Sequence, residues 1–332
     1  MLAALLNKVK ESPMRAAIFT APDASPVCAD FPEPTVPPGS EPLQLVGAGL
    51  HNVVRGLATG RHYGRGQMRY PLVPGIDAVA RTSDGRLVYT GYARPPFGTM
   101  AERLFAPFQA DVPAGADPLA IAAGMNPSLS GWMVLTARRR ELGALGTVLV
   151  LGATGTSGSL AVQGALALGA ERVIAAGRDQ GTLEQLRGEG ATTVSLAHDG
   201  PDSLERALAD VVSETAPGLV LDYLWGSVAE AAFAALGRSG EDVEADTSYV
   251  QIGTLAGAKA ALPADLLRSR RIRITGSGVG SVSHEEMLAE APEVMARFAD
   301  GTLHLPYTAF PLSRIGEAWA HTGRSRVVVV PD

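Results

Sequence analysis

The sequence predicts an α/β protein with two domains, one mainly β and one a doubly wound parallel sheet. Its 332 residues are about twice the length of a typical domain. From about residue 128 to 277, apolar runs of strand length alternate with stretches of helical period. This alternation is typical of a parallel sheet covered by helices on both faces. Outside that region, short apolar runs broken by proline and glycine indicate a mainly β domain.

The first part of the chain carries the strand signals of the β-rich domain. Apolar runs occupy residues 16–19, 42–46 and 78–80. The dipeptide Asp84-Gly85 follows the last run and precedes residues 86–89, and both residue types tolerate the positive φ of a hairpin turn. We therefore expect a β-hairpin at this point.

The middle of the chain carries the alternating pattern. Strands are expected at 147–151, 172–176, 219–222, 249–252 and 272–275, and helices at 156–169, 179–189, 201–214 and 227–237. Beyond Gly276 we expect helices at 284–300 and about 313–322 and strands at 306–310 and 327–330. Because the chain ends in a strand, the terminal piece is expected to return to the first domain. We assign 1–127 and 278–332 to the β-rich domain and 128–277 to the doubly wound domain.

Composition and charge exclude several classes of protein. The 28 basic residues against 34 acidic ones give a net charge of −6, which is not the basic balance of a nucleic-acid binder. No apolar run reaches the roughly 20 residues of a membrane span. A single cysteine, Cys28, excludes an internal disulfide and a zinc site of several thiolates. With no secretory signal recognisable at the start, we expect a cytoplasmic protein without nucleic-acid or membrane partners.

A glycine-rich segment, Gly152-Ala-Thr-Gly155-Thr-Ser-Gly158, follows the strand expected at 147–151. Glycines spaced by three at a strand-to-helix junction permit a sharp turn and a close approach of the backbone to a pyrophosphate, which the helix N-terminus binds. The spacing alone is common in turns, so the surrounding strand-loop-helix-strand unit is what indicates dinucleotide binding. The expected cofactor contacts are Gly152, Thr154, Gly155, Thr156, Ser157 and Gly158.

The end of the next strand indicates which dinucleotide binds. Enzymes that choose NAD usually place a carboxylate there for the ribose 2′-hydroxyl, but this chain has Gly177-Arg178. Glycine leaves room for a 2′-phosphate, and the guanidinium of Arg178 can bind it with charge-assisted hydrogen bonds. Alternatively, Arg178 is a solvated arginine at the start of a helix, and the negative charge of Asp179 partly offsets its positive charge. We expect NADPH as the cofactor.

Taken together, these features resemble the medium-chain dehydrogenase/reductase superfamily, specifically its zinc-free quinone oxidoreductase-like branch. The resemblance spans about Met14 to Pro331. Besides the glycine loop, it is carried by the segments that begin at Met14, Gly49, Tyr70, Phe97, Ala122 and Gly323. It implies a GroES-like catalytic domain built from both ends of the chain, a Rossmann domain in the middle, bound NADPH and frequently a homodimer.

The resemblance also implies that no metal takes part. Zinc-dependent relatives take catalytic ligands from positions that fall on His51, on Ile76 and near Asn126. Isoleucine cannot bind zinc, and the four-cysteine structural zinc lobe is absent. We therefore expect hydride transfer to a carbon that is already polarised, such as that of a quinone or an α,β-unsaturated carbonyl.

Three residues of the β-rich domain are candidates for the chemistry. The resemblance places His51 and Asn52 near the nicotinamide, and Tyr63 in the substrate pocket. His51 or Tyr63 could donate a hydrogen bond or a proton to the oxyanion that hydride transfer creates. Alternatively, His51 is hydrogen-bonded within its own domain and Tyr63 only packs. If Tyr63 is a donor, Tyr63→Phe should lower kcat and leave NADPH affinity unchanged.

The remaining candidate cofactor contacts follow from the resemblance alone. Positions that edge the nicotinamide correspond to Asn126 and Ser130, at the start of an interdomain helix, and to Gly253 and Thr254. Arg326 matches a basic residue that often approaches the cofactor, but a surface cation before the last strand is an alternative. Asp77 and Glu102 are interpreted as structural carboxylates.

Two other functions stay open at the level of sequence. One is reduction of enoyl thioesters, and the other is a catalytically idle NADPH-binding protein that acts as a sensor or partner surface. Residues 1–13 lie outside the resemblance. Either they form an extension, or Met14 is the true start of the protein. The acidic stretch 240–246 resembles an inserted, solvated loop.

Overall fold

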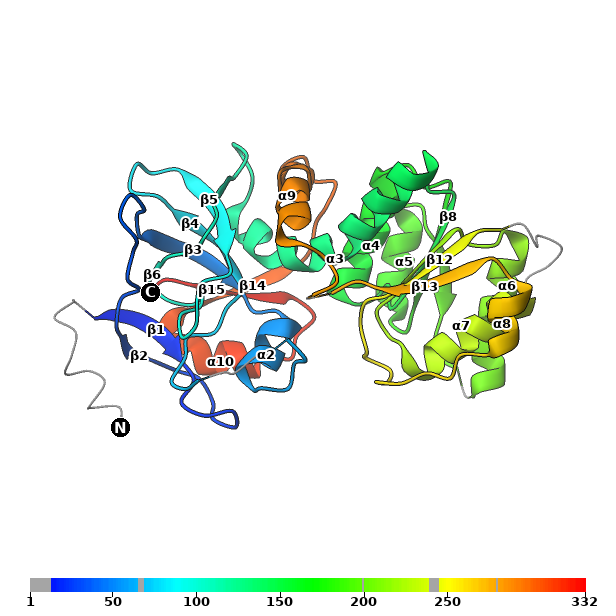
Figure 1. The fold of residues 1–332 in the computed structure, drawn as a ribbon, viewed down its shortest axis with the longest axis horizontal. Helices are drawn as coiled ribbons and strands as arrows, with labels where there is room; N and C mark the ends of the chain where they lie inside the picture. The colour runs from blue at the N-terminus through cyan, green and yellow to red at the C-terminus, as the bar shows by residue number, and fades with distance from the viewer. Residues whose placement is uncertain (1–12, 65–68, 199, 239–244, 279) are drawn as a thin grey trace. The chain divides into compact units, whose positions relative to one another are not determined.

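The computed structural model describes residues 13–64, 69–198, 200–238, 245–278 and 280–332. The chain forms two compact units, drawn in Figure 1, and is divided after Asn126 and after Glu290. We call the part up to Asn126 together with Ala291–Asp332 the β-rich unit, and Pro127–Glu290 the doubly wound unit. The expected extension up to residue 12 and most of the acidic stretch, residues 240–244, lie outside the described residues.

The second division lies later than the predicted 277/278. Helix α9 (His284–Ala299) begins in the doubly wound unit, where Glu290 is bonded to residues of helix α3 (Pro118–Leu142). The Glu290 carboxylate accepts hydrogen bonds from Trp132 Nε1 at 3.1 Å and from Arg140 at 2.6 Å. These contacts explain why the compact unit extends beyond the last strand of its sheet.

The doubly wound unit contains a six-stranded parallel sheet in the order β10-β9-β8-β11-β12-β13. Its strands are β8 (Thr147–Leu151), β9 (Arg172–Gly177), β10 (Thr192–Ser195), β11 (Leu219–Asp222), β12 (Thr247–Gln251) and β13 (Ile272–Gly276). Its helices are α4 (Thr156–Ala167), α5 (Gln180–Gly188), α6 (Pro201–Glu214), α7 (Gly226–Arg238) and α8 (Ala264–Ser269), with parts of α3 and α9. The predicted doubly wound sheet is confirmed.

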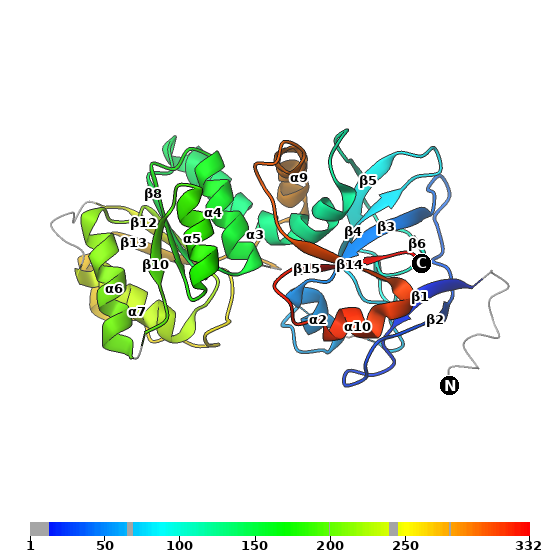
Figure 2. The same cartoon turned by 180° about the vertical axis from the view of Figure 1, so that it is seen from behind.

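Alternation along the strands builds one apolar layer on each face of this sheet. Val148 and Val150 of β8 pack with α3, α4 and α5, whereas Leu149 and Leu151 pack with α6, α7 and α8. All five residues of β8 are buried and apolar or β-branched, because the strand contributes side chains to the apolar layer on each face of the sheet. Figure 2 shows the same layers from behind.

Helix α3 differs from the prediction. It begins at Pro118 and runs through Pro127, so Asn126 and Ser130 lie in its middle and not at its start. Asn126 is the last residue of the β-rich unit before the division, and Ser130 belongs to the doubly wound unit.

The β-rich unit is built around a seven-stranded sheet with the path β14-β15-β3-β4-β5-β7, while β6 pairs with β3. These strands are β3 (Leu43–Gly49), β4 (Asp77–Arg81), β5 (Leu87–Gly91), β6 (Arg103–Leu104), β7 (Ala110–Asp111), β14 (Tyr307–Pro311) and β15 (Arg326–Val330). A separate two-stranded sheet contains β1 (Met14–Ile18) and β2 (Val27–Phe31), and the helical segments of this unit alone are α2 (Asn52–Ala58), η1 (Leu312–Arg314) and α10 (Ile315–Ala320). One apolar core joins residues from both ends of the chain, including Ile18, Leu45 and Val329.

The predicted hairpin between β4 and β5 is confirmed. The two strands pair antiparallel, and Gly85 adopts a φ of +91° in the turn. The Asp84 carboxylate accepts hydrogen bonds from the Thr82 hydroxyl and the Arg86 guanidinium, which hold its pKa at about 2. No helix in the described part of the chain has the length and apolar character that crossing a membrane requires.

Candidate functional site

The glycine loop of the doubly wound unit has the geometry of a phosphate cradle. Gly152 directly follows β8 with a φ of +93°, and its N–H donates to Ala176 O at 2.9 Å. A Cβ at Gly158 would lie 2.2 Å from Gly152 O, so helix and strand approach closely at this point. A Cβ at Gly155 would meet only that same oxygen, at 3.5 Å, which leaves the loop open on its outer side.

Helix α4 presents its N-terminus at this loop. Gly155 is the N-cap residue and makes no side-chain cap hydrogen bond, and Thr156 and Ser157 form the first turn. The first N–H groups of a helix lack partners within the helix, and the helix dipole favours an anion beside them. The residues present therefore fit a dinucleotide pyrophosphate.

Gly177 and Arg178 lie beside the same loop. A Cβ at Gly177 would lie 2.3 Å from Thr154 Cγ2, so glycine makes room for the loop at the end of β9. Arg178 is exposed, and its guanidinium has no hydrogen-bond or ion-pair partner among the described residues. The Asp179 carboxylate instead caps α5, where Oδ1 accepts from the Thr182 N–H at 2.9 Å. This arrangement leaves Arg178 available to an incoming anion.

The turns after β11 and β12 complete this edge of the sheet. A Cβ at Gly253 would lie 2.3 Å from Tyr223 O, and Thr254 beside it is exposed. The Ser130 hydroxyl donates to Pro127 O at 2.7 Å and lies 3.3 Å from the Tyr223 hydroxyl. Because β9, β8, β11 and β12 are neighbours, their carboxyl ends bring the glycine loop, Gly177 and Gly253 to one edge.

Sequence reasoning missed Asp222, which organises the turn after β11. Its Oδ1 accepts from the N–H groups of Leu224 at 2.8 Å and Trp225 at 2.9 Å, and its Oδ2 accepts from the Tyr249 hydroxyl at 2.7 Å. Burial raises the pKa of Asp222, and these hydrogen bonds oppose that rise. A carboxylate at the end of an apolar strand was the signal that could have identified it.

In the β-rich unit, three polar side chains form a buried chain of hydrogen bonds. His51, at the N-cap of α2, is 2% exposed, and its Nε2 lies 3.0 Å from Asp77 Oδ1. Asp77 Oδ2 accepts from the Tyr89 hydroxyl at 2.9 Å. His51 Nδ1 is buried and has no partner within the described part of the chain. We call His51, Asp77 and Tyr89 the buried polar cluster.

The other two candidate catalytic residues are placed differently. Asn52 is exposed at the first position of α2. Tyr63 is 74% exposed, and its ring stacks on His62 with centroids 4.3 Å apart. The structure does not bring Tyr63 into the buried polar cluster, so a joint role for His51 and Tyr63 stays a prediction.

Arg326 is the first residue of β15, in the β-rich unit, and does not belong to the same unit as the glycine loop. It is half-buried. Its pKa is lowered mainly by burial and further by the nearby Arg55, whereas Asp77 raises it.

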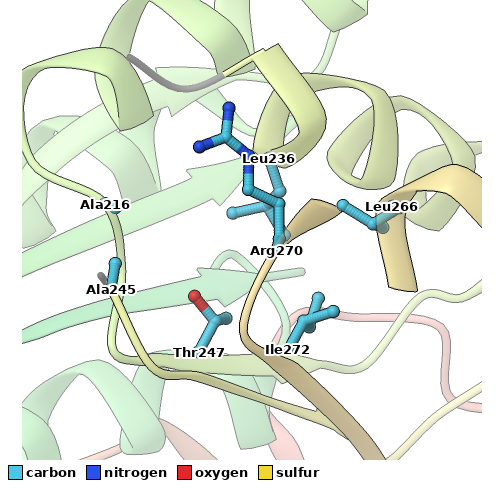
Figure 3. A pocket seen from close by; sticks show the side chains of 7 residues that line it. All are labelled: Ala216, Leu236, Ala245, Thr247, Leu266, Arg270 and Ile272. Carbon is cyan, nitrogen blue, oxygen red and sulfur yellow. The ribbon is translucent and has the colours of Figure 1, made fainter. Parts of the chain in front are cut away.

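Two further features bear on the chemistry, the metal-binding groups of the described residues and a small pocket of the doubly wound unit. Among the described residues, no group of three or more His, Cys, Asp or Glu side chains could hold a metal ion. Figure 3 shows a pocket of the doubly wound unit lined by Leu236, Thr247, Leu266, Arg270 and three neighbours. Its volume of about 10 Å³ is enough for roughly one water molecule, so it is not a substrate site.

Comparisons with known proteins identify the family. No protein-family model matches the chain. A probable NADPH-dependent quinone reductase of Emericella nidulans, tdiC, is 31% identical over 349 aligned positions, which cover 92% of this chain and 96% of the relative. The chain belongs to the medium-chain dehydrogenase/reductase superfamily, in its quinone oxidoreductase-like branch.

Solved structures of this superfamily share the fold. A mycobacterial quinone oxidoreductase matches with a TM-score of 0.78 at 19% identity, over 96% of this chain and 100% of its own. The quinone oxidoreductase of Thermus thermophilus, also solved with NADPH, matches with a TM-score of 0.75 at 24% identity, over the same shares. At these identities the likeness concerns the fold. The β-rich unit is thus the GroES-like domain of a medium-chain oxidoreductase, and the doubly wound unit is its Rossmann domain.

Proposed function

We propose that this NADPH-dependent oxidoreductase reduces a quinone or an α,β-unsaturated carbonyl without a zinc ion. The observation that carries the proposal is the glycine cradle at the β8–α4 junction, with the unpaired Arg178 beside it in the described part of the chain. The quinone part is supported by the related tdiC protein, which bears the name of a probable NADPH-dependent quinone reductase. Enone reduction extends the same chemistry, because hydride adds to a similarly polarised carbon.

The chain's own residues would bind and orient the reactants. When bound, NADPH supplies the hydride. Gly152–Gly158 and the first turn of α4 would hold the pyrophosphate, and Arg178 would hold the 2′-phosphate. Asn126, Ser130 and Gly253-Thr254 are proposed to border the nicotinamide. His51 or Tyr63 is the proposed hydrogen-bond donor to the substrate oxygen, with Asn52 beside His51.

Cofactor choice gives the first prediction. Arg178→Ala removes a charge-assisted contact to the 2′-phosphate, which NADH lacks, so NADPH binding should weaken by about 10- to 150-fold and NADH binding should change little. Fluorescence titration of both cofactors measures the difference. Arg187→Ala, which removes an exposed arginine within the following helix α5, is the control. Equal losses for NADPH and NADH would show that Arg178 does not bind the 2′-phosphate.

Zinc independence gives the second prediction. His51 Nε2 and Asp77 Oδ1 are hydrogen-bonded to each other, and Tyr89 uses the other carboxylate oxygen. Because these atoms are already paired, we expect no stoichiometric zinc by elemental analysis of protein purified without metal affinity. Activity should also survive incubation with a chelator. A tightly held zinc whose removal stops turnover and whose return restores it would contradict the proposal.

The substrate class is tested by one panel. Purified protein is mixed with NADPH and with simple quinones, enones or enoyl-CoA thioesters, and the loss of cofactor absorbance is followed. Turnover of quinones or enones supports the proposal, whereas turnover confined to enoyl-CoA thioesters would make the protein an enoyl-thioester reductase. Tight NADPH binding without turnover of any class would favour the idle, sensor-like protein.

We also propose a homodimer in the cytoplasm. Strand β13 is an edge strand that pairs only with β12 in the described sheet, and most of its side chains are exposed or half-buried. Leu255, Leu262 and Leu267 expose apolar surface in the segment that precedes it. A second copy of the chain that pairs along this edge would cover both the strand β13 and the exposed leucines. Sedimentation velocity measures the oligomeric state. A monomer at micromolar protein concentration would contradict the proposed dimer.

A further inference from the structure

The turn that follows β11, residues 223–226, contains a strained residue. Trp225 has a φ of +56°, in the left-handed region that a bulky side chain rarely adopts. In the described part of the chain, Tyr92 is the only other non-glycine residue with a positive φ. Strain of this kind persists only where the surrounding structure enforces it, and it clusters at functional sites. The contacts that hold Trp225 therefore indicate what the turn does.

The Asp222 carboxylate holds the turn from inside the sheet. Its side chain is fully buried, and its Oδ1 accepts from the N–H groups of both Leu224 and Trp225. An aspartate that accepts from N–H groups two and three residues ahead folds the chain back over its own side chain. The Trp225 ring lies T-shaped to Phe233 and Tyr249, with centroids 5.8 and 6.4 Å away. Both ends of the turn are therefore fixed to the core of the doubly wound unit.

The turn supports the first part of the loop after β12, residues 253–257. The Ala256 N–H donates to Leu224 O at 2.8 Å. A Cβ at Gly226 would lie 2.5 Å from Ala256 O, so the backbones of the turn and the loop are in direct contact. The loop residues from Thr254 to Ala256 are exposed, and burial does not hold them in place. The position of this part of the loop therefore depends on the turn.

The glycine loop after β8 is held by different contacts. The N–H groups of Gly152 and Ala153 both donate to Ala176 O of β9, each at 2.9 Å. The turn reaches this loop through the Leu224 side chain, which would lie 3.1 Å from a Cβ at Gly152. If the turn relaxed, the loop after β12 would lose a backbone hydrogen bond, whereas the glycine loop would keep its attachment to β9.

We propose that Asp222 is a positioning residue for the nicotinamide half of NADPH. This assignment rests on the proposed function, in which the glycine loop binds the pyrophosphate and Gly253-Thr254 borders the nicotinamide. Because Asp222 is fully buried, it acts through the turn, which holds residues 253–257 at a fixed distance from the glycine loop. A cofactor that spans both loops requires that distance, whereas a ligand bound by the glycine loop alone does not.

Two ligands of different length test the assignment. Adenosine 2′,5′-bisphosphate carries the phosphates of the adenosine half and lacks the nicotinamide, so its affinity reports on the glycine loop and Arg178. In Asp222→Ala, we expect NADPH binding to weaken about 10- to 100-fold by fluorescence titration, because the loop after β12 is displaced. Binding of the bisphosphate, measured by calorimetry, should stay within about twofold of the parent.

A conservative variant and a control separate the turn from the general stability of the core. Asp222→Asn keeps an oxygen that can accept from both N–H groups, so its NADPH affinity should stay within about threefold of the parent. Tyr249→Phe removes the hydrogen bond to the other carboxylate oxygen and leaves the turn intact. It should lower the Tm but change the affinity for neither ligand.

A second variant breaks the same link from the exposed side and decides the test if Asp222→Ala does not fold. Ala256→Pro removes the N–H that donates to Leu224 O, so it should also weaken NADPH binding and spare the bisphosphate. Ala258→Pro is the matched control, because Ala258 is exposed and its N–H has no partner among the described residues. It should leave both affinities unchanged.

Two results would overturn the proposal. Equal losses for both ligands in Asp222→Ala would show that the carboxylate only maintains the fold around the glycine loop. Unchanged affinity for NADPH in Asp222→Ala, or in Ala256→Pro, would show that the turn does not position the cofactor. A wrong proposed function gives another pattern, because Gly158→Ala would then bind both ligands as tightly as the parent. Neither measurement requires turnover of a quinone.

Discussion

Gly158→Ala is expected to abolish measurable NADPH binding. The added Cβ would lie 2.2 Å from Gly152 O and 2.9 Å from Ala153 Cα, and these backbone atoms cannot move aside without displacing the loop. Gly152 has a φ of +93°, a conformation that glycine adopts readily and that other residues rarely adopt. A shift of about 1 Å in such a cradle weakens function about 100-fold or more. Titration of NADPH fluorescence measures the loss.

Two further alanine variants separate local folding from binding. Gly155→Ala has room in the free protein, so its Tm should match the parent while the methyl group blocks the approach of the pyrophosphate. Gly188 lies in helix α5, and a Cβ added there would meet no atom within 4 Å. Gly188→Ala should therefore lower neither the stability of the protein nor its affinity for NADPH. Unchanged NADPH affinity in Gly158→Ala would show that the phosphates bind elsewhere.

Asp77→Ala is expected to cause the largest loss of stability among single substitutions in the β-rich unit. The Asp77 side chain is fully buried, and its removal leaves the Tyr89 hydroxyl and the His51 ring without their shared acceptor. Breaking a buried polar pair from one side costs about 3 kcal/mol or more of unfolding free energy. Urea unfolding followed by circular dichroism measures the change.

Milder substitutions show whether the hydrogen bonds are responsible. Tyr89→Phe removes only one of them and should cost about 1 kcal/mol. Asp111→Ala breaks the ion pair with Arg86, in which both partners are largely exposed, so its effect should stay below about 1 kcal/mol. If Asp77→Ala were as stable as Asp111→Ala, the buried polar cluster would not hold the β-rich unit together.

The doubly wound unit could be predicted in detail because each element carries its own signal. Strand β8 occupies the predicted residues 147–151, and α6 occupies the predicted 201–214. Two elements were not predicted, the six-residue helix α8 and the strand β10. Strand β10, Thr192–Ser195, has one apolar residue among four and lies at the edge of the sheet. An edge strand needs little apolar surface, so periodicity did not indicate it.

The polar contacts of the candidate site could not be predicted, because they depend on the pairing of distant strands. His51 and Asp77 are separated by 26 residues, and they come together because β3, which leads to His51, pairs with β4, which begins at Asp77. The sequence interpretation left a structural role for His51 open, and its hydrogen bond to Asp77 agrees with that alternative. The exposure of Tyr63 depends on the path of its loop, for which the sequence has no periodic pattern.

The position of β15 inside the sheet affects how the chain can fold during its synthesis. Strands β3, β4 and β5 leave the ribosome early, but β15, the neighbour of β3, and β14 beyond it are made after the whole doubly wound unit. Until then β3 lacks its partner β15, and the core residues beside Val327–Val329 stay uncovered. The doubly wound unit is continuous and can fold while the β-rich unit is still incomplete. A nascent chain that stalls in this interval exposes an unpaired strand edge, and aggregation or chaperone binding is most favoured at that stage.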